Sequence, residues 1–535
     1  MLLVAGLLVL YAGRHLTFFF DEWDFILQRR GSGPDVYLDP HNGHLVLFPV
    51  VVYKLLFAIV GLRHYTPYRA VAVALHLLCG VLLYCLVRRR LGSSLALAPT
   101  VLLLFMGSAF EDLLWPFQIG LFVSVAGGLG ALLCLERQDG RGDVAAAVLL
   151  VWSLTGSAVG VPFVVAGAVM LIGQRGPWQR LWVVVAPAAL FGLWYLGWGA
   201  NEHVTSDAVL GAPQYAADAA SGAAAGIAGL TITWGPPLAI AALVAILIGV
   251  RRQGGSPSPL LLGAAAGLFA FWLLAAVARA DAAEPTASRY EYVGAAFIFL
   301  IASEAWAGTA LRGGWAALAA VLIAGAVVGN IDALRVGADV YRGVDASVRA
   351  SLAAVELAAP VVAPTFVPEP TNAPQITAGP YLAAVRDLGS PALTLSQLEH
   401  APASTRANSD LVLIQAEQLA LMPVAGAITG ASRPVIEASS GGRISAVGRC
   451  ARLLPTAAAA TLGLRVAPGG QVLIHANLGH PVAIYLRRLA TTFQAPFAFV
   501  PGGTARTIRF SVDRASGLPW HLRLSAAQAT EVCVR

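Results

Sequence analysis

Charged residues are scarce in this sequence. Only 12% of its 535 residues are Asp, Glu, Lys or Arg, while 57% are hydrophobic. The mean hydropathy is +0.71, and apolar runs repeatedly reach the roughly 20 residues that a helix needs to cross a bilayer. This balance excludes a soluble globular protein and predicts an α-helical polytopic membrane protein.

Lysine is almost absent, because Lys54 is the only one. The net charge of +6 therefore comes almost wholly from arginine, most of which falls in short loops or in the C-terminal third. Such a distribution indicates membrane topology and argues against nucleic-acid binding. We find no internal repeat and no nucleotide-binding glycine pattern. Residues 1–16 lack a basic start and a small-residue cleavage site, so we expect a first spanning helix and not a signal peptide.

Ionisable residues are also rare inside the apolar runs. His76 is the main exception, and a lone histidine on an apolar helix is more often a satisfied core residue than a functional one. Ion-coupled transporters and channels place charges or broken helices near the membrane midplane. A lipid or polysaccharide transporter, which would need a polar central path, stays an alternative, but the pattern favours an extracytoplasmic cleft at the membrane surface. Polar and acidic residues collect at 21–24, 41–44, 111–118 and 279–290.

The apolar runs predict eleven spans, with the shorter run 45–60 lying on the membrane surface. Every loop that alternation then makes cytoplasmic contains arginine, as at 88–90 and 312, which satisfies the positive-inside rule. The odd count places the rest of the chain outside. The predicted spans are 1–16, 68–87, 93–109, 117–135, 143–157, 158–174, 179–198, 226–250, 258–278, 291–307 and 314–332.

Composition changes after the last span. We expect a transmembrane domain over 1–333, a helical leader and proline-rich linker over 334–408, and an extracytoplasmic β-sandwich over 409–535. The last part alternates short Val-, Ile- and Leu-rich runs with Gly and Pro turns. Cys450 and Cys533 lie near its two ends, outside the reducing cytosol, so we expect them to form a disulfide.

Three carboxylates, Asp21, Glu22 and Asp24, follow the first apolar segment directly. Acidic groups at a membrane surface are costly and often functional, and a helix would place Asp21 and Asp24 on one face. We expect Trp23 and the phenylalanines at 18–20 to anchor the lipid interface around them. The plainer alternative is a solvated helix terminus.

Four features follow one another in residues 15–92: a first span, an acidic outer loop, a histidine opening an interfacial helix, and a span that closes with Arg-Arg-Arg-Leu-Gly at 88–92. With these features the sequence resembles the GT-C superfamily of polytopic glycosyltransferases, near the dolichyl-phosphate-mannose-type family 39. A weaker likeness is the pair Arg289-Tyr290 before a late span. One departure concerns His44, which is followed by Leu45-Val46 where family 39 often has two prolines, and this leaves the acceptor class open.

This resemblance implies a GT-C-like fold and transfer of a sugar from a polyprenyl-phosphate donor to a glycan, lipid or protein acceptor outside the cytoplasm. It also implies a carboxylate base on the first outer loop, matched by Asp21 with Glu22 beside it. A base that takes the proton of an acceptor hydroxyl contributes roughly 10²–10⁴-fold to the rate. We expect an inverting mechanism, with Arg289 at the phosphate leaving group because a guanidinium fork suits it, and Tyr290 next to it as a further substrate-binding candidate.

Other polar residues are candidates for substrate binding. The plainer alternative is that these residues only make the loops polar. A second alternative is a non-enzymatic envelope scaffold in which the sandwich does the binding, with carbohydrate as a candidate ligand. His41 and His44 could hold a divalent metal together with a carboxylate. These residues alone do not complete a set of metal ligands, so the sequence implies no cofactor. The substrate-binding candidates are Asp24, His41, His44, Glu111, Asp112 and Gln118.

Overall fold

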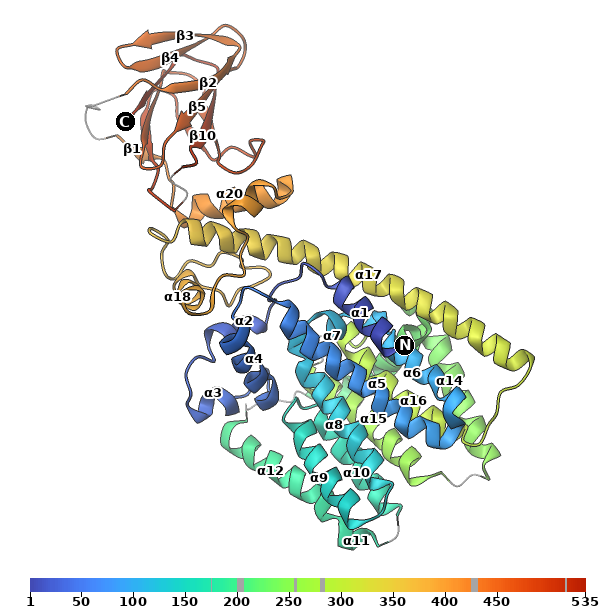
Figure 1. Cartoon of the computed structure of the whole chain (residues 1–535). Helices are drawn as coiled ribbons and strands as arrows, with labels where there is room; N and C mark the ends of the chain where they lie inside the picture. Colours follow the sequence, from blue (N-terminus) through green and yellow to red (C-terminus); the bar gives the residue numbers. More distant parts are fainter. Residues whose placement is uncertain (175, 200–205, 255–256, 280–283, 425–431, 515–516) are drawn as a thin grey trace. The chain divides into compact units, whose positions relative to one another are not determined.

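The structure is a computed structural model (Figure 1), and it describes residues 1–174, 176–199, 206–254, 257–279, 284–424, 432–514 and 517–535. The chain divides into two units. The helical unit consists of Met1–Leu16 and Gln28–Arg342. The C-terminal unit consists of Thr17–Leu27 and Gly343–Arg535, and so it contains the acidic cluster.

The helical unit is a bundle of apolar helices. Helices that are apolar all round are typical of a membrane interior, and six helices in the described residues are long and apolar enough to cross one. Its helices are α1 (Leu2–Ala12), α3 (Pro34–Leu38), α4 (Leu47–Val60), α5 (Thr66–Leu95), α6 (Leu97–Leu104), η1 (Gly107–Ala109), α7 (Phe110–Leu114), η2 (Pro116–Gln118), α8 (Ile119–Leu135), α9 (Gly140–Leu154), α10 (Gly160–Ile172), α11 (Pro177–Arg180), α12 (Trp182–Trp198), α13 (Ser206–Ala228), η3 (Ile232–Trp234), α14 (Gly235–Arg252), α15 (Pro259–Arg279), α16 (Ser288–Ala305) and the first part of α17 (Gly314–Leu357).

Helix α8 lies at the centre of this bundle. Nearly all of its residues are buried. A Cβ atom on Gly128 would lie 2.0 Å from the ring of Phe163 in α10, and one on Gly127 would lie 2.7 Å from the carbonyl oxygen of Leu149 in α9. Small residues let apolar helices approach closely where no water drives their association. These glycines therefore set the spacing of α8, α9 and α10.

Two predicted segments differ from the structure. The outer loop expected at 199–225 contains helix α13, which buries Tyr215 and Ala219 against Ala275 and Ala276 of α15. Its alanine-rich sequence favours a helix, and its small side chains pack where a polar loop was expected. The last predicted span and the predicted leader after it form one continuous helix, α17 (Figure 1).

The number of membrane crossings stays a prediction. Besides the six long helices, the described residues include shorter apolar helices at Leu2–Ala12, Leu47–Val60, Gly160–Ile172 and Trp182–Trp198. Each of these is shorter than the roughly 20 residues of a perpendicular span. A count from length and composition alone therefore does not establish eleven crossings.

A reporter that is active only in the cytoplasm is expected to be silent when it is fused after Arg535, because the predicted odd number of spans would place the C-terminal unit outside. The matched control is the same reporter inserted after Arg252, in a loop predicted to be cytoplasmic, where it should be active. Reporter activity in whole cells measures both. Activity after Arg535 would contradict the odd count.

The C-terminal unit contains the predicted β-sandwich. One antiparallel sheet has the order β1-β9-β6-β11-β4-β3 and the other β2-β5-β10-β7-β8. Leu462 and Leu522 of the second sheet belong to one buried core with Ile474 and Val532 of the first. The strands are β1 (Met422–Pro423), β2 (Val435–Ser440), β3 (Gly442–Val447), β4 (Cys450–Pro455), β5 (Ala460–Val466), β6 (Gln471–Ala476), β7 (Val482–Arg487), β8 (Ala498–Val500), β9 (Ala505–Arg509), β10 (Trp520–Ala526) and β11 (Thr530–Val534).

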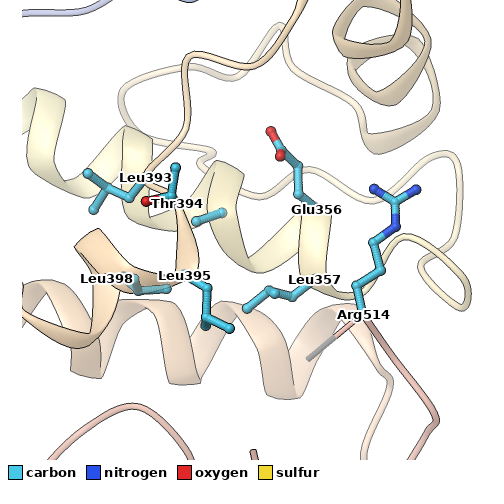
Figure 2. Close-up of a pocket in the computed structure, with 8 residues that line it drawn as sticks. Glu356, Leu357, Leu393, Thr394, Leu395, Leu398 and Arg514 are labelled. Carbon is cyan, nitrogen blue, oxygen red and sulfur yellow. The ribbon is translucent and has the colours of Figure 1, made fainter. Parts of the chain in front are cut away.

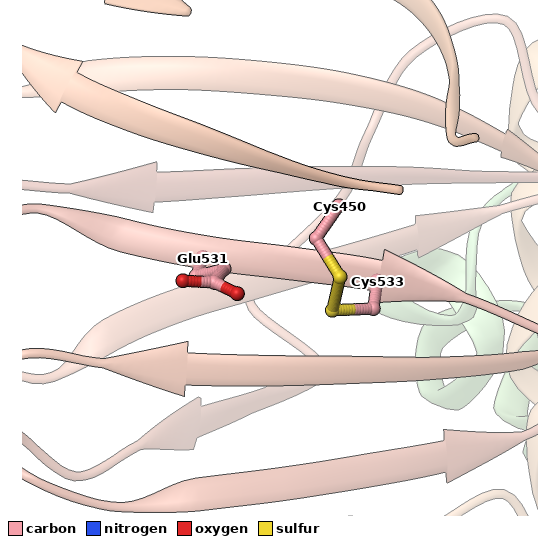
Figure 3. A group of neighbouring side chains, drawn as sticks. All are labelled: Cys450, Glu531 and Cys533. Carbon is pink, nitrogen blue, oxygen red and sulfur yellow. A yellow bond between two sulfur atoms is a disulfide. The ribbon is translucent and has the colours of Figure 1, made fainter. Parts of the chain in front are cut away.

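The predicted disulfide is confirmed: Cys450 and Cys533 are bonded (Figure 3), with Cα atoms 4.4 Å apart. They lie on β4 and β11, which are neighbours in one sheet, so strand pairing itself brings the two sulfurs together. Glu531 lies two residues before Cys533 on the same strand and forms an ion pair with Arg452 at 3.0 Å. The bond thus joins the first residue of β4 to the last strand of the sandwich.

The last part of α17 and four further helices complete the C-terminal unit: α2 (Glu22–Leu27), α18 (Ala378–Leu388), α19 (Leu395–Glu399) and α20 (Ala403–Ala416). The stretch predicted as a proline-rich linker is packed within this unit. The N–H of Ala378 donates to the carbonyl of Phe366 at 2.9 Å, and Ala373 and Ile376 are fully buried. The predicted boundaries at residues 333 and 408 stay predictions.

A buried polar cluster fastens α20 to the sandwich. The carboxylate of Asp410 accepts the backbone N–H groups of Arg488, Leu489 and Ala490 at 3.0, 2.9 and 3.0 Å. The guanidinium of Arg488, which is fully buried, forms ion pairs with Asp513 and, at 3.5 Å, with Glu417. Charges without water need such partners, so this cluster fixes how helix and sheet meet within the unit.

Candidate functional site

The acidic cluster begins helix α2 in the C-terminal unit. Phe20 has a positive φ of 44°, and this bend precedes Asp21 and the helix. Glu22 is fully buried, and its Oε2 atom accepts the N–H of Phe19 at 2.9 Å. Asp21 and Asp24 are half-buried. Glu22 therefore stabilises the start of the helix, while Asp21 and Asp24 keep a path to solvent.

The aromatic residues of this segment are mostly core. Trp23 and Phe18 are fully buried, and the indole N–H of Trp23 donates to the carbonyl of Phe18 at 3.2 Å. The Trp23 ring meets Tyr381 of α18 edge-on, with centroids 5.9 Å apart. The prediction that Trp23 and Phe18 anchor the lipid interface is wrong, because their rings fill the interior of the C-terminal unit. Phe20 is 36% exposed.

A second polar cluster lies in the helical unit, where α7 meets the start of α16. The Nη1 atom of Arg289 is 3.7 Å from Oε2 of Glu111. Next to them, Ser288 accepts the backbone N–H of Glu111 at 3.2 Å and donates to the carbonyl of Ser108 at 2.6 Å. Segments about 180 residues apart are thus fastened together, and two separately predicted site residues become neighbours.

Two further carboxylates, the buried Asp112 and the half-buried Glu291, accompany this ion pair. Asp112 is fully buried, and in the described part of the chain neither of its oxygens has a hydrogen-bond partner. The charges that act on it are Glu111, Arg289 and Glu291. A Cβ atom on Gly226 would lie 2.2 Å from Oε2 of Glu291, so any other residue there would displace that side chain. Buried carboxylates beside a guanidinium are a strong indication of a functional site.

Sequence reasoning missed Glu291 and Asn330. Glu291 stood at the first residue of a predicted span, although its position two residues after Arg289 was a usable signal. Asn330 lies inside the apolar part of α17, where nothing in the sequence marks it. Its Oδ1 atom accepts the N–H of Ser108 at 3.0 Å, and its Nδ2 atom donates to the carbonyl of Gly226 at 2.9 Å. Asn330 thus connects the two segments that flank the cluster, at Ser108 and at Gly226 of α13.

His76 is a satisfied core residue, as predicted. Its Nε2 atom lies 3.2 Å from the carbonyl of Leu104, which can only accept a hydrogen bond. Nε2 therefore carries the proton, and Nδ1 accepts from the hydroxyl of Tyr292 at 2.9 Å. The imidazole is neutral in this arrangement and links α5 to α16.

His41 and His44 flank a tight turn. Their backbones exchange hydrogen bonds at 3.0 and 2.9 Å, and Asn42 and Gly43 have positive φ angles of 49° and 75°. Asn-Gly is the preferred pair for this type of turn. The His41 ring contacts Phe117 with centroids 5.1 Å apart, which brings the first two predicted outer loops together. Whether the two histidines bind substrate or metal stays a prediction.

Tyr290 and Gln118 also lie in the helical unit. The Tyr290 ring lies 5.6 Å below the guanidinium carbon of Arg289 and contacts Tyr215 and Phe271, with centroids 6.4 Å apart in both cases. Gln118 is 9% exposed at the start of α8. Residues 280–283 of the predicted outer loop lie outside the described residues. Asp21 and Arg289 belong to different units, so their joint action stays a prediction.

A small cavity in the C-terminal unit contains none of the predicted site residues. Its volume is about 150 Å³. Figure 2 shows the side chains of Glu356 and Arg514 projecting to the same side above leucines that include Leu357 and Leu395. Glu356 accepts hydrogen bonds from Tyr381 and Ser390 at 2.6 and 2.5 Å. Its carboxylate is therefore engaged in the packing of α17 against α18.

Comparison with known proteins finds similarity among solved structures. No protein-family model matches the chain, and no curated protein matches it. Among solved structures, the chain is similar to the crystal structure of ArnT from Cupriavidus metallidurans bound to undecaprenyl phosphate. The two are 13% identical with a TM-score of 0.47, over 71% of this chain and 84% of that chain.

Proposed function

We propose that this chain transfers a sugar from a polyprenyl-phosphate donor to an acceptor outside the cytoplasm. The observation that carries the proposal is the cluster of Arg289, Glu111, Asp112 and Glu291 at the ends of apolar helices. A guanidinium there can bind the phosphate of a lipid that lies among the helices, and carboxylates beside it can accept hydrogen bonds from sugar hydroxyls. We place this chemistry in the GT-C class, near family 39.

The ion pair between Arg289 and Glu111 leaves room for a ligand. At 3.7 Å it is longer than a charge-assisted hydrogen bond, and the two side chains are 37% and 24% exposed. A phosphate oxygen can therefore approach Arg289 without breaking a tight bond. Asp112 is fully buried nearby and interacts electrostatically with Arg289.

The proposed reaction is a single displacement. The acceptor hydroxyl attacks the anomeric carbon, and the bond from that carbon to the phosphate oxygen breaks. The configuration at the anomeric carbon is thereby inverted. Asp21 takes the proton of the hydroxyl as the new bond forms. The bond electrons leave with the polyprenyl phosphate, and its growing charge is stabilised by Arg289.

The proposed location of the acceptor follows from topology and redox chemistry. Arginine-bearing loops alternate along the sequence, and the sandwich carries the disulfide between Cys450 and Cys533. Disulfides form and persist outside the reducing cytosol. Both observations support a C-terminal unit on the extracytoplasmic face of the plasma membrane, where a glycan, lipid or protein acceptor would meet the site.

Arg289→Lys is expected to slow donor turnover by about tenfold, because a point charge replaces a fork that binds two phosphate oxygens. The assay reconstitutes the full chain in liposomes with a polyprenyl-phosphate sugar and measures the release of polyprenyl phosphate. Arg312→Lys is the matched control, since Arg312 is exposed on a loop predicted to be cytoplasmic. Equal turnover by both variants would remove Arg289 from the phosphate site, and no turnover by the native chain would refute the proposed function.

A further inference from the structure

The outer face of the five-stranded sheet is rich in arginine and aromatic residues. Side chains of β5, β7 and β10 alternate between buried and more exposed positions, so every second residue points away from the sandwich core. In register, His521 pairs with both Arg465 and Arg487, and Arg523 pairs with Tyr485. We call this set the basic face: Arg465, Tyr485, Arg487, Phe493, His521 and Arg523.

Two of its arginines are held in place by rings. The guanidinium carbon of Arg523 lies 4.3 Å from the Tyr485 ring centroid and 4.6 Å from that of Phe493. The guanidinium of Arg487 lies 5.0 Å from Phe493, and its Nη1 atom donates to the carbonyl of Ala490 at 2.8 Å. Stacking fixes the guanidinium planes, so little conformational entropy remains to be lost on binding.

The negative charge on this face is already engaged. Glu437 accepts from Nε of Arg465 at 2.9 Å and lies 2.7 Å from Nδ1 of His521. Glu437 lies where the register between β2 and β5 shifts. A β-bulge at such a shift changes the direction of a side chain. Among the described residues, no carboxylate lies within ion-pair distance of Arg487 or Arg523.

Both of these arginines also keep an unused donor. The Nε atoms of Arg487 and Arg523 are buried, and in the described part of the chain they have no hydrogen-bond partner. A buried donor without an acceptor is costly, and a charged donor gains most from an anionic acceptor. These Nε atoms are closed to solvent, so an anion that lies across the two guanidinium groups would bond to their terminal nitrogens.

We propose that the basic face binds an anionic polysaccharide, one that carries carboxylates along its chain. The cations form a row across β5, β10 and β7, with neighbouring strands about 4.8 Å apart, and a row suits a linear polymer with repeated charges. The rings of Tyr485 and Phe493 are half-buried beneath the guanidiniums. A ligand therefore lies flat on this face, and no side chain of the basic face inserts into the ligand.

The test measures binding of the full chain, held in nanodiscs of zwitterionic lipid, to immobilised polygalacturonate. Binding is expected to weaken as salt is raised, and dextran, which is neutral, should retain nothing. Arg487→Gln and Arg523→Gln should each weaken binding by about tenfold, because each removes one charge-assisted contact. The matched control is Arg509→Gln, which removes the same charge from an exposed position on β9 of the other sheet and should bind as the native chain does.

Three outcomes would overturn the proposal: equal retention by dextran, equal weakening by Arg509→Gln, or capture by phosphatidylglycerol vesicles with the same arginine dependence and none by polygalacturonate. The last outcome would assign the face to lipid headgroups. Arg523→Lys keeps the charge and guards against misfolding, so it should bind between Arg523→Gln and the native chain. Release of polyprenyl phosphate is measured separately, and failure of either proposal is therefore distinguishable from failure of the other.

Discussion

Replacing Asp21 with asparagine is expected to lower the rate of sugar transfer by about a hundredfold or more, with normal insertion into the membrane. The amide keeps the shape of the side chain and its place before α2 but cannot take a proton from the acceptor. Asp21 is half-buried, so the change leaves no large cavity. The measurement is the rate of transfer from a polyprenyl-phosphate donor by the reconstituted chain.

Two control variants separate base catalysis from other effects. Glu22→Gln should cost less, since an amide oxygen can still accept the N–H of Phe19 that Glu22 accepts at 2.9 Å. Asp39→Asn removes an exposed carboxylate from the same predicted loop and should leave the rate unchanged. If Asp21→Asn transferred sugar at the native rate, the base would lie elsewhere, and Glu22 or Glu111 would be tested next.

Arg488→Met is expected to destabilise the C-terminal unit by about 3–5 kcal/mol. Burial, and after it the Asp513 carboxylate, raises the pKa of Glu417 to about 8. At neutral pH the principal charge pair of the cluster is thus Arg488 with Asp513, both fully buried. Removing the guanidinium leaves Asp513 as an uncompensated charge and also removes the donors that satisfy the carbonyl of Leu518.

Limited proteolysis of the full chain across a temperature series measures this loss of stability. The matched control is Arg452→Met, because Arg452 pairs with Glu531 at the surface with side chains 44% and 24% exposed. An exposed pair of this kind contributes about 1 kcal/mol or less. Equal protease resistance of the Arg488 variant and the native chain would show that the cluster does not hold α20 to the sandwich.

Features that depend on local pattern were predictable from the sequence. Alternating runs with Gly and Pro turns indicated the sandwich, and the positions of Cys450 and Cys533 indicated their bond. Glu111 and Arg289 were each found because charge interrupts an apolar run. Their proximity was not predictable, because it depends on the packing of α7 against α16 and on the bonds of Ser288.

Other features depend on what a helix meets in space. The sequence does not show whether Trp23 faces lipid or protein. Its contact with Tyr381 in the structure shows that it faces protein. The alanine-rich stretch of α13 was read as a loop because it contains polar residues, yet its buried face is made of small residues. Asn330 gives no local signal, since its partners lie over 100 residues away.

The place of β11 in its sheet has a consequence for biosynthesis. This strand is the last of the sandwich in sequence, yet it lies between β6 and β4 and not at an edge. Until residues up to Val534 have been synthesised and can pair, the six-stranded sheet stays split, with two strand edges open to wrong pairings. Closure of the bond between Cys450 and Cys533 can occur only after that insertion. The oxidised pair therefore reports that β11 has taken its place in the sheet.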